Sequence, residues 1–203
     1  LDGFVAGPDQ SVENPLGIGG ERLHEWVVDL AEFRQAHGMD GGEVNESSAV
    51  VQEELTNIGA TIMGRNMFGG HPGPWDAKQP WKGWWGDNPP YHHPVFVLTH
   101  HAREPLELDG GTTFTFVTSG IEDALALATR AADGKDVALA GGALAAQQYL
   151  AAGLVDEMEI HLAPTLLGSG ERLFEGLGDT LHGFELVRTV AAPGVTHLKF
   201  ARG

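Results

Sequence analysis

The stretch VALAGGALAAQQYL, residues 137–150, constrains the fold of this chain more than any other. It joins a short β-type run, residues 137–140, to a helix pattern through two adjacent glycines, Gly141 and Gly142. Glycines at the end of a buried strand let another backbone or a ligand approach where a Cβ atom would collide. The helix that follows would direct its free N–H groups and positive dipole end at that ligand, which is usually a phosphate. A strand-to-helix turn that binds nothing fits the same pattern about equally well.

The composition limits the classes of protein to which the chain can belong. It has 203 residues, of which 42% are hydrophobic, enough for one α/β domain with a substantial core. It has no cysteine, which excludes disulfides, thiolate catalysis and cysteine-bound metals. Its formal charge of −16 repels nucleic acid and anionic lipid. An anionic cofactor must therefore be bound by a few arginine, histidine and backbone N–H groups.

The ends and the apolar runs of the sequence give expectations about location and domains. No uninterrupted apolar stretch reaches the roughly 18 residues that span a bilayer, and no export signal begins the chain. We therefore expect a cytoplasmic protein with neither nucleic-acid nor membrane partners. Without internal repeats or a long linker, residues 1–203 are expected to form a single domain. The chain begins with Leu1 rather than Met, so we expect part of the first strand to be missing.

Apolar spacing and turn residues predict the helices. Each predicted helix has apolar residues on one face, and two of them end at a glycine suited to a left-handed conformation, Gly59 and Gly153. Ser119 and Glu122 have the spacing of a capping box. The predicted helices cover residues 22–37, 47–58, 65–69, 121–132 and 142–152.

Short apolar or alternating runs predict the strands. They alternate with helices through the middle of the chain, and two antiparallel strands close it around a Pro193–Gly194 turn. This order predicts an α/β fold with a mixed, mostly parallel sheet, helices on both faces and an antiparallel C-terminal pair. The predicted strands cover residues 1–7, 60–64, 94–99, 113–118, 137–140, 156–164, 184–191 and 195–201.

The segment 70–94 has no useful periodicity, although it holds four of the five tryptophans of the chain. A structureless segment of this length is uncommon in a compact domain and is usually functional or disordered. Four tryptophans argue against disorder. We expect them to pack either on the domain itself or on a partner subunit.

Three predicted strands end in residues that suit phosphate. The strand ends are followed by Gly64–Met67, by Thr99–Arg103 and by Gly141–Ala145. In an open α/β sheet, ligands bind outside the carboxyl ends of the strands. Glycine allows close backbone approach, and the guanidinium of Arg65 suits bidentate phosphate binding. Three such ends in an acidic chain indicate a nucleotide with several phosphates.

Four segments in matching order, IMGRNMFGG, PVFVLTHHAREP, VALAGGALAAQQYL and LAPTLLGSGERLF, resemble the dihydrofolate reductase superfamily. The most similar type is the riboflavin-biosynthesis reductase domain, that is, the RibD C-terminal domain and its stand-alone relatives. The opening LDGFVAG resembles the first strand of that family, which normally begins earlier. The resemblance covers nearly the whole chain and implies a dihydrofolate reductase-like three-layer fold. The sequence departs from the folate enzymes in residues 8–46 and 70–93, where the substrate should bind.

The resemblance implies NADPH as the cofactor and assigns four groups of residues to it. One group faces the nicotinamide, with a loop residue that can close over it; a second contacts the phosphates at a strand–helix junction. A third lies near the adenosine ribose and 2′-phosphate, and a fourth cradles the pyrophosphate. In that order the groups are Val5, Ala6, Gly7 and Ile18; Gly64, Arg65, Asn66 and Met67; Thr99, His100 and Arg103; and Gly141, Gly142, Ala143, Leu144 and Ala145.

Two carboxylates are candidates for a catalytic role. By resemblance, the substrate ring lies between the first strand and the helix that begins near Glu46, whose carboxylate could hydrogen-bond a pyrimidine or pteridine. Glu46 equally fits a residue that only complements a helix dipole. Asp2 is the second candidate, because an Asp-Gly pair near the first strand recurs in the riboflavin-type branch. Its alternative is a turn-forming Asp-Gly.

The paired histidines do not predict a metal site. His92–His93 and His100–His101 are sequence neighbours, so on a strand their side chains face opposite ways. No HExxH or comparable spacing is present, and we expect no metal.

The resulting hypothesis is an NADPH-dependent reductase that transfers hydride to a small heterocyclic or sugar-derived substrate. By resemblance, the reaction would be reduction of 5-amino-6-(5-phosphoribosylamino)uracil in riboflavin biosynthesis, by a homodimer. The alternative is a non-catalytic nucleotide-binding or dimeric interaction protein that kept the fold. A Rossmann dehydrogenase is disfavoured, because no GxGxxG follows the first strand.

Overall fold

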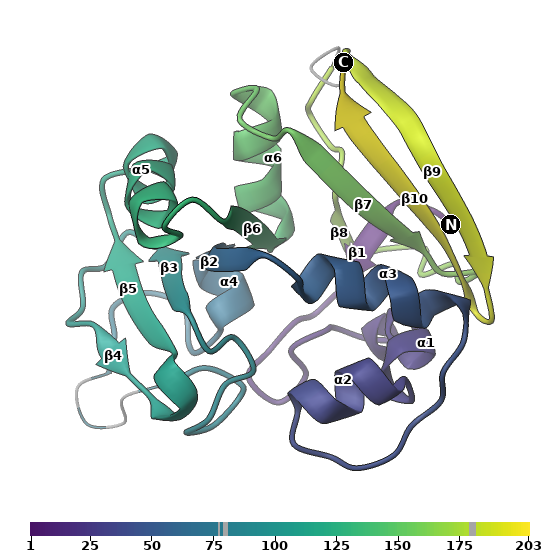
Figure 1. Cartoon of the computed structure of the whole chain (residues 1–203). Helices are drawn as coiled ribbons and strands as arrows, with labels where there is room; N and C mark the ends of the chain where they lie inside the picture. The colour runs from purple at the N-terminus through teal and green to yellow at the C-terminus, as the bar shows by residue number, and fades with distance from the viewer. Residues whose placement is uncertain (77, 79–80, 179–181) are drawn as a thin grey trace. The chain divides into compact units, whose positions relative to one another are not determined.

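The computed structural model describes residues 1–76, 78, 81–178 and 182–203, and these residues form two compact units. Residues Asn57–Ala146 form one, called here the central unit after its place in the sequence. Residues Leu1–Thr56 and Gln147–Gly203 form the other, called the terminal unit because it contains both ends of the chain. Figure 1 labels the elements of both units. The expected single domain over residues 1–203 stays a prediction.

The central unit is built on a five-stranded sheet with the order β4-β5-β3-β2-β6. The four strands β5, β3, β2 and β6 are parallel, and the two-residue β4 pairs antiparallel at one edge. This arrangement confirms the mostly parallel sheet, although β4 was not predicted. The strands are β2 (Ile58–Gly64), β3 (Pro94–Leu98), β4 (Leu106–Glu107), β5 (Thr113–Val117) and β6 (Asp136–Gly141).

Helices cover both faces of this sheet, as the sequence predicts. On one face, Phe68 of the short helix α4 (Arg65–Phe68) packs into a buried cluster with strand residues such as Met63 and Val97. Ile62 alternates with Met63 along β2 and therefore points to the other face, where α5 (Ile121–Ala131) packs on β2 and β3. Opposite faces follow from right-handed crossovers, because the chain crosses from β2 to β3 in one direction and from β5 to β6 in the other.

The described part of the tryptophan-rich segment packs on its own unit. Among the described residues of 70–93 there is no helix or strand; positions 77, 79 and 80 lie outside the described residues. Trp75, Trp81 and Trp85 pack against the aromatic cluster around Phe68. The indole N–H groups of Trp81 and Trp84 donate to the carbonyl oxygens of Phe68 (2.9 Å) and Met67 (3.0 Å). The segment is therefore an ordered cover for one face of the sheet.

The terminal unit contains a three-stranded antiparallel sheet with the order β7-β10-β9 (Figure 1, green to yellow). The predicted strand over 156–164 and the predicted closing pair are thereby confirmed. In the same unit, β1 (Phe4–Ala6) pairs antiparallel with the two-residue β8 (Glu171–Arg172), which was not predicted. The sheet strands are β7 (Glu157–Leu162), β9 (Phe184–Ala192) and β10 (Val195–Arg202).

Two further helices matter for the site. The helix α3 (Glu46–Leu55) packs against β9 within the terminal unit. The helix α6 (Ala143–Ala151) starts in the central unit, and its last residues belong to the terminal unit. It ends as predicted, with Gly153 at φ 70° and a 3.0 Å bond from the N–H of Leu154 to the carbonyl oxygen of Tyr149.

The single helix predicted over residues 22–37 is wrong. The chain instead forms the 3₁₀ turn η1 (Gly20–Leu23) and the short helices α1 (Glu25–Val28) and α2 (Ala31–Ala36). The break lies at Leu30, whose extended backbone (ψ 141°) forms an isolated bridge with Glu43 while its side chain is only 1% exposed. Tertiary burial of Leu30 therefore overrides the local helical periodicity.

One predicted helix boundary and one predicted capping box are also wrong. The helix α3 ends at Leu55, because Thr56 is extended and Asn57 is left-handed. Gly59 is not a helix cap but a strand residue in β2, where an added Cβ would lie 2.4 Å from the carbonyl oxygen of Ala132. At the start of α5, Gly120 (φ 103°) is the N-cap without a side-chain cap bond, so the predicted capping box is absent.

A minor 3₁₀ turn, η2 (Asp109–Gly111), precedes β5. Of the helices within the described ranges, none has the length and apolar character to cross a bilayer.

Candidate functional site

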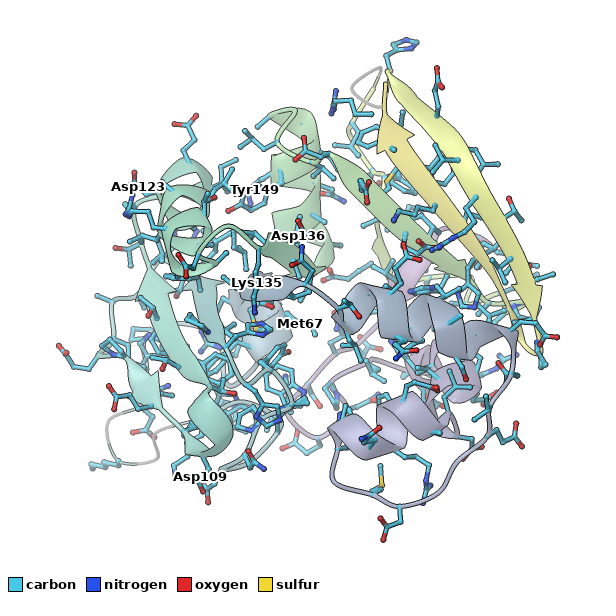
Figure 2. All side chains as sticks on the ribbon, viewed as in Figure 1. Met67, Asp109, Asp123, Lys135, Asp136 and Tyr149 are labelled. Atoms are coloured by element: carbon cyan, nitrogen blue, oxygen red, sulfur yellow. The ribbon has the colours of Figure 1, made fainter. Side chains whose placement is uncertain are left out.

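The three strand ends selected from the sequence meet at one edge of the central sheet. The strands β6, β2 and β3 are neighbours and parallel, with Met63 opposite Gly141 and Gly64 opposite Leu98. Their carboxyl ends therefore lie side by side. Lys135 and Asp136, labelled in Figure 2, flank the opposite end of β6. The structure thus brings together the predicted groups that begin at Gly64, Thr99 and Gly141.

The glycines at this edge leave room on one side and allow close packing on the other. A Cβ atom added to Gly64 would lie 3.2 Å from the Cβ of Ala145 and 3.6 Å from the backbone nitrogen of Gly142. Gly64 therefore lets the start of α6 approach β2. The Gly141–Gly142 peptide bond is cis, and a Cβ added to either residue would meet no described protein atom within 4 Å. This open glycine pair suits a group that needs close backbone approach.

Arg65 is held by aromatic and backbone contacts rather than by a carboxylate. Its guanidinium carbon lies 3.6 Å from the centre of the Trp75 ring, within the range of a cation–π contact. Its Nη2 donates to the carbonyl oxygen of His71 at 2.8 Å. Its Nε is buried and has no hydrogen-bond partner among the described residues. A buried guanidinium N–H without an acceptor is a place where an anion can bind.

Arg103 lies against the same tryptophan. Its guanidinium carbon is 4.9 Å from the Trp75 ring centre, and its Nη1 donates to the carbonyl oxygen of Trp81 at 2.5 Å. Burial lowers the pKa of both arginines, and the nearby charge of Arg103 lowers that of Arg65 further. No salt bridge among the described residues involves either one. In a chain of net charge −16, these two cations mark a site for a negatively charged group.

The other predicted residues at this edge have mixed environments. The hydroxyl of Thr99 is mostly buried and accepts from the N–H of His101 at 3.2 Å, so it stabilises the turn after β3. His100 and Asn66 are exposed. Met67, labelled on α4 in Figure 2, packs against the aromatic cluster. Its side chain therefore serves the core.

The first turn of α6 presents the remaining predicted residues. Leu144 is 62% exposed, whereas Ala143 and Ala145 are buried. The N–H groups of Ala145 and Ala146 bond the carbonyl oxygen of Gly142 at 3.0 and 3.1 Å, which fixes the turn from the glycine pair into the helix.

In the terminal unit, the structure brings Gly7 and Ile18 together. The N–H of Gly7 donates to Leu16, and the N–H of Ile18 donates to Pro8, each at 2.8 Å. A Cβ added to Gly7 would lie 2.2 Å from the carbonyl oxygen of Ile18, so only glycine permits this loop. Val5 is 38% and Ile18 61% exposed, and Ala6 is buried. An apolar ligand surface next to β1 is therefore possible at Val5 and Ile18.

Glu46 is the first residue of α3 and is exposed. The helix is capped by Asn45, whose side chain accepts from the N–H of Ser47 at 2.8 Å. Glu46 is therefore not needed as the cap, although it still lies where a carboxylate complements the helix dipole. Both interpretations of Glu46 stay predictions.

Asp2 has a structural role in this fold. Its Oδ2 accepts from the N–H groups of Leu167 (2.9 Å) and Gly168 (2.7 Å). These bonds, led by the one from Gly168, lower the pKa of Asp2. A carboxylate held in its ionised form is a poor proton donor, so the contacts favour loop attachment over acid catalysis. The catalytic role of Asp2 stays a prediction.

The sequence did not identify Trp75 and His71 as partners of Arg65. The Trp-rich composition marked the segment, but no local pattern indicates which tryptophan meets which arginine. The described residues contain no cluster of three or more histidine, aspartate or glutamate side chains arranged to hold a metal.

Comparison with protein-family models gives one match. A model described as the RibD C-terminal domain matches residues 1–198. A search of curated proteins found no match.

Solved structures show the same fold. A Shewanella sp. PV-4 protein named for riboflavin biosynthesis has a TM-score of 0.64 at 22% identity, over 100% of this chain and 94% of its own. The Thermotoga maritima diaminohydroxyphosphoribosylaminopyrimidine deaminase/5-amino-6-(5-phosphoribosylamino)uracil reductase has a TM-score of 0.55 at 15% identity, covering 100% and 54%. RibD of Acinetobacter baumannii, form 1, has a TM-score of 0.50 at 20% identity, covering 77% and 51%. The chain therefore spans about half the length of these last two proteins.

Proposed function

The chain belongs to the RibD C-terminal domain family, and on that premise we propose that it is an NADPH-dependent reductase. Its substrate is a small heterocyclic or sugar-derived compound. Family membership supports a reductase-type role; the cofactor and the substrate are part of the proposal.

The observation that carries the proposal is the arginine pair beside Trp75. Arg65 and Arg103 contact the same indole, lack a carboxylate partner among the described residues, and leave the Arg65 Nε without an acceptor. Bringing two guanidinium groups together is unfavourable unless an anion compensates their charge. NADPH differs from NADH by one phosphate, and that dianionic group suits a pair of guanidinium donors.

The remaining residues at the sheet edge fit the rest of the cofactor. The open Gly141–Gly142 backbone and the start of α6 would bind the pyrophosphate. Val5 and Ile18 belong to the terminal unit, and their role at the nicotinamide, which the family resemblance implies, stays a prediction. When bound, NADPH supplies the hydride that reduces a C=N or C=O carbon of the substrate. The protein then has to orient the substrate, exclude water and provide a proton.

We further propose 5-amino-6-(5-phosphoribosylamino)uracil as the substrate. The Thermotoga maritima protein with the same fold carries that reductase in its name. Glu46 would accept hydrogen bonds from the N–H groups of the pyrimidine ring. Ile18 lies in the loop packed on Gly7 and would shield the reacting carbon from water. Assembly as a homodimer in the cytoplasm stays a prediction.

The test compares NADPH and NADH binding by isothermal titration calorimetry. We expect Arg65→Ala to weaken NADPH by about tenfold or more, as expected for loss of a charged hydrogen bond worth about 1.5–3 kcal/mol. NADH binding should change much less. Arg130→Ala is the matched control, because Arg130 is an exposed arginine in the last turn of α5. Equal loss for both cofactors would remove Arg65 from recognition of the 2′-phosphate.

Turnover distinguishes the enzyme from the non-catalytic alternative. With the uracil substrate present, we expect NADPH absorbance at 340 nm to fall, and Glu46→Gln to slow that reaction more than it weakens NADPH binding. Cofactor binding without oxidation, across pyrimidines, pteridines and ketones, would favour the nucleotide-binding protein. The tryptophans pack within the central unit, and the interaction-module alternative stays a prediction.

A further inference from the structure

Four side chains of the terminal unit form a continuous hydrogen-bonded network, which begins at Ser47, the residue after Glu46. Ser47 Oγ lies 2.9 Å from Nε2 of His197, and Nδ1 of His197 lies 2.8 Å from Nδ1 of His161. Nε2 of His161 lies 3.0 Å from Oε1 of Glu54. The two histidines are directly opposite each other on β10 and β7.

The hydrogen-bonded network spans the helix α3 from one end to the other. Ser47 lies in the first turn of α3 and Glu54 near its last residue, seven positions apart and therefore two turns along the same face. Both ends of α3 are thus attached to the β7–β10 pair through the two imidazole rings. Trp26 packs on both rings, with its ring centre 4.9 Å from that of His161 and 5.0 Å from that of His197.

The donor and acceptor capacity of each group fixes where the protons lie when both histidines are neutral. The Glu54 carboxylate can only accept, so His161 must carry its proton on Nε2. The Nδ1 of His161 is then an acceptor, and His197 must donate from its own Nδ1. The Nε2 of His197 is left as an acceptor for the hydroxyl of Ser47. Only this one arrangement satisfies all three bonds with both histidines neutral.

Adding one proton reverses two of the three bonds. The proton between the two Nδ1 atoms moves to His161, which becomes an imidazolium paired with Glu54. His197 gains the added proton on Nε2 and stays neutral, and the Ser47 hydroxyl turns from donor to acceptor. The positive charge rests on His161, whose side chain is 27% exposed, and not on His197, which is fully buried. A second proton would leave two imidazolium rings in contact, which is strongly unfavourable.

We propose that Ser47, His197, His161 and Glu54 form a one-proton switch that makes the attachment of α3 to the antiparallel sheet dependent on pH. Above the pH at which this proton is taken up, the hydrogen-bonded network with both histidines neutral attaches both ends of α3 to the sheet. Acidification inserts a charge at His161 and reverses the bond to the first turn of the helix.

Other charges surround the switch on each packed element. They are Glu53 on α3, Glu159 on β7, Arg188 on β9 and Lys199 on β10, and they form ion pairs with one another. Burial lowers the pKa of His197, as do the charges of His161 and Arg188, while Glu54 raises it. Because His197 stays neutral in the folded protein, whereas an unfolded histidine takes up a proton near pH 6.5, the folded state loses stability as pH falls below that value.

Histidine ¹⁵N NMR of the unmodified protein tests the proton arrangement directly. At pH 8 we expect His197 to carry its proton on Nδ1 and His161 on Nε2. On acidification, both rings should change in one step, as His161 becomes charged and His197 changes to the Nε2–H form. Equal tautomers at pH 8, or titration of His161 without a change at His197, would overturn the proposal.

Unfolding as a function of pH tests the consequence for stability. Between pH 6.5 and 5, the folded-to-unfolded ratio of the wild type should fall by up to about tenfold per pH unit for each proton that the unfolded state binds in excess. His161→Gln, at a partly exposed position, removes the proton exchange between the two rings and should leave His197 in one tautomer throughout, whereas the loss of stability that comes from the neutral His197 should remain. His37→Gln is the control, because His37 is exposed, stacks on Phe33 and is not part of the hydrogen-bonded network. A change of the His197 tautomer on acidification of His161→Gln would contradict the switch.

Discussion

Two of the helix–sheet contacts in this protein, those of α4 and α3, use opposite chemistry. In the central unit, α4 meets its sheet through Phe68, which has aromatic rings on three sides and no exposed surface. In the terminal unit, the hydrogen bonds and ion pairs between α3 and its sheet join ionisable and hydroxyl groups, with Glu53 bonded to Arg188 and Lys199, Glu54 to His161, and Ser47 to His197. The first contact is the same at any pH, whereas the second depends on which groups carry protons.

The two contacts therefore have different roles: the aromatic contact supports ligand binding, and the polar contact responds to pH. Aromatic packing gives the sheet edge of the central unit a rigid base on which Arg65 and Arg103 can be held in place. Partly exposed ion pairs contribute little on average, so the polar contact of α3 can be shifted at small cost. We therefore expect mutations in the first contact to change global stability and mutations in the second to change its dependence on pH and salt.

The largest expected effect is that of Phe68→Ala. Removing a fully buried phenylalanine should lower the free energy of unfolding by about 3–5 kcal/mol, because burial is lost and a cavity forms. Urea denaturation at constant pH measures it. Phe174→Ala is the control, since Phe174 is 39% exposed, and should cost about 1 kcal/mol or less. Equal losses would show that the aromatic cluster is not the stabilising core of its unit.

The sequence predicted the buried strands of the central sheet well and the polar contact of α3 poorly. The parallel strands are continuous apolar runs, so their burial on both faces could be read directly. The chain of Ser47, His197, His161 and Glu54 depends on the register of β7 with β10, which local sequence does not specify. Alternation along residues 156–164 placed His161 on a polar face, but not next to His197.

The same limit applies to the candidate site. Strand order in a parallel sheet follows few rules, and these were enough to expect the ends at Gly64, Thr99 and Gly141 near one another. Between Arg65 and Trp75 the chain has no regular structure after the end of α4, so no periodicity fixes which residue contacts Arg65. The break at Leu30 was missed for a similar reason, because long-range burial opposed a helical pattern.

Trp75→Leu should have an effect of intermediate size, and it tests whether the aromatic cluster beneath Arg65 supports ligand binding. Leucine keeps apolar contact but loses the cation–π attraction, worth about 0.5–1 kcal/mol, so NADPH should bind roughly two- to fivefold more weakly. Calorimetric titration with NADPH measures the change. Trp85→Leu is the control, because Trp85 packs on Tyr91 and Phe114 and has no arginine over its ring among the described contacts. A larger loss with Trp85→Leu would mean that general packing, not the arginine contact, supports binding.

Glu53→Gln should have the smallest effect and isolates the electrostatic part of the α3 contact. Hydrogen bonds from Lys199 and then from Arg188 lower the pKa of Glu53, so its contribution is present above its ordinary value near 4.5 and is lost as pH falls through the lowered value. At pH 7 we expect a cost of about 0.2–1 kcal/mol, because the side chain is half exposed.

Salt separates this cost from a packing defect. In urea denaturation, raising ionic strength from about 0.01 M to 1 M shortens the Debye length roughly tenfold, so the difference between Glu53→Gln and wild type should shrink. Asp87→Asn is the control, since it breaks an exposed pair with Lys82 in the central unit and should cost nothing measurable. A Glu53→Gln difference that stays constant with salt would mean that α3 is held by shape rather than charge. The contrast between the two helix–sheet contacts would then be one of composition only.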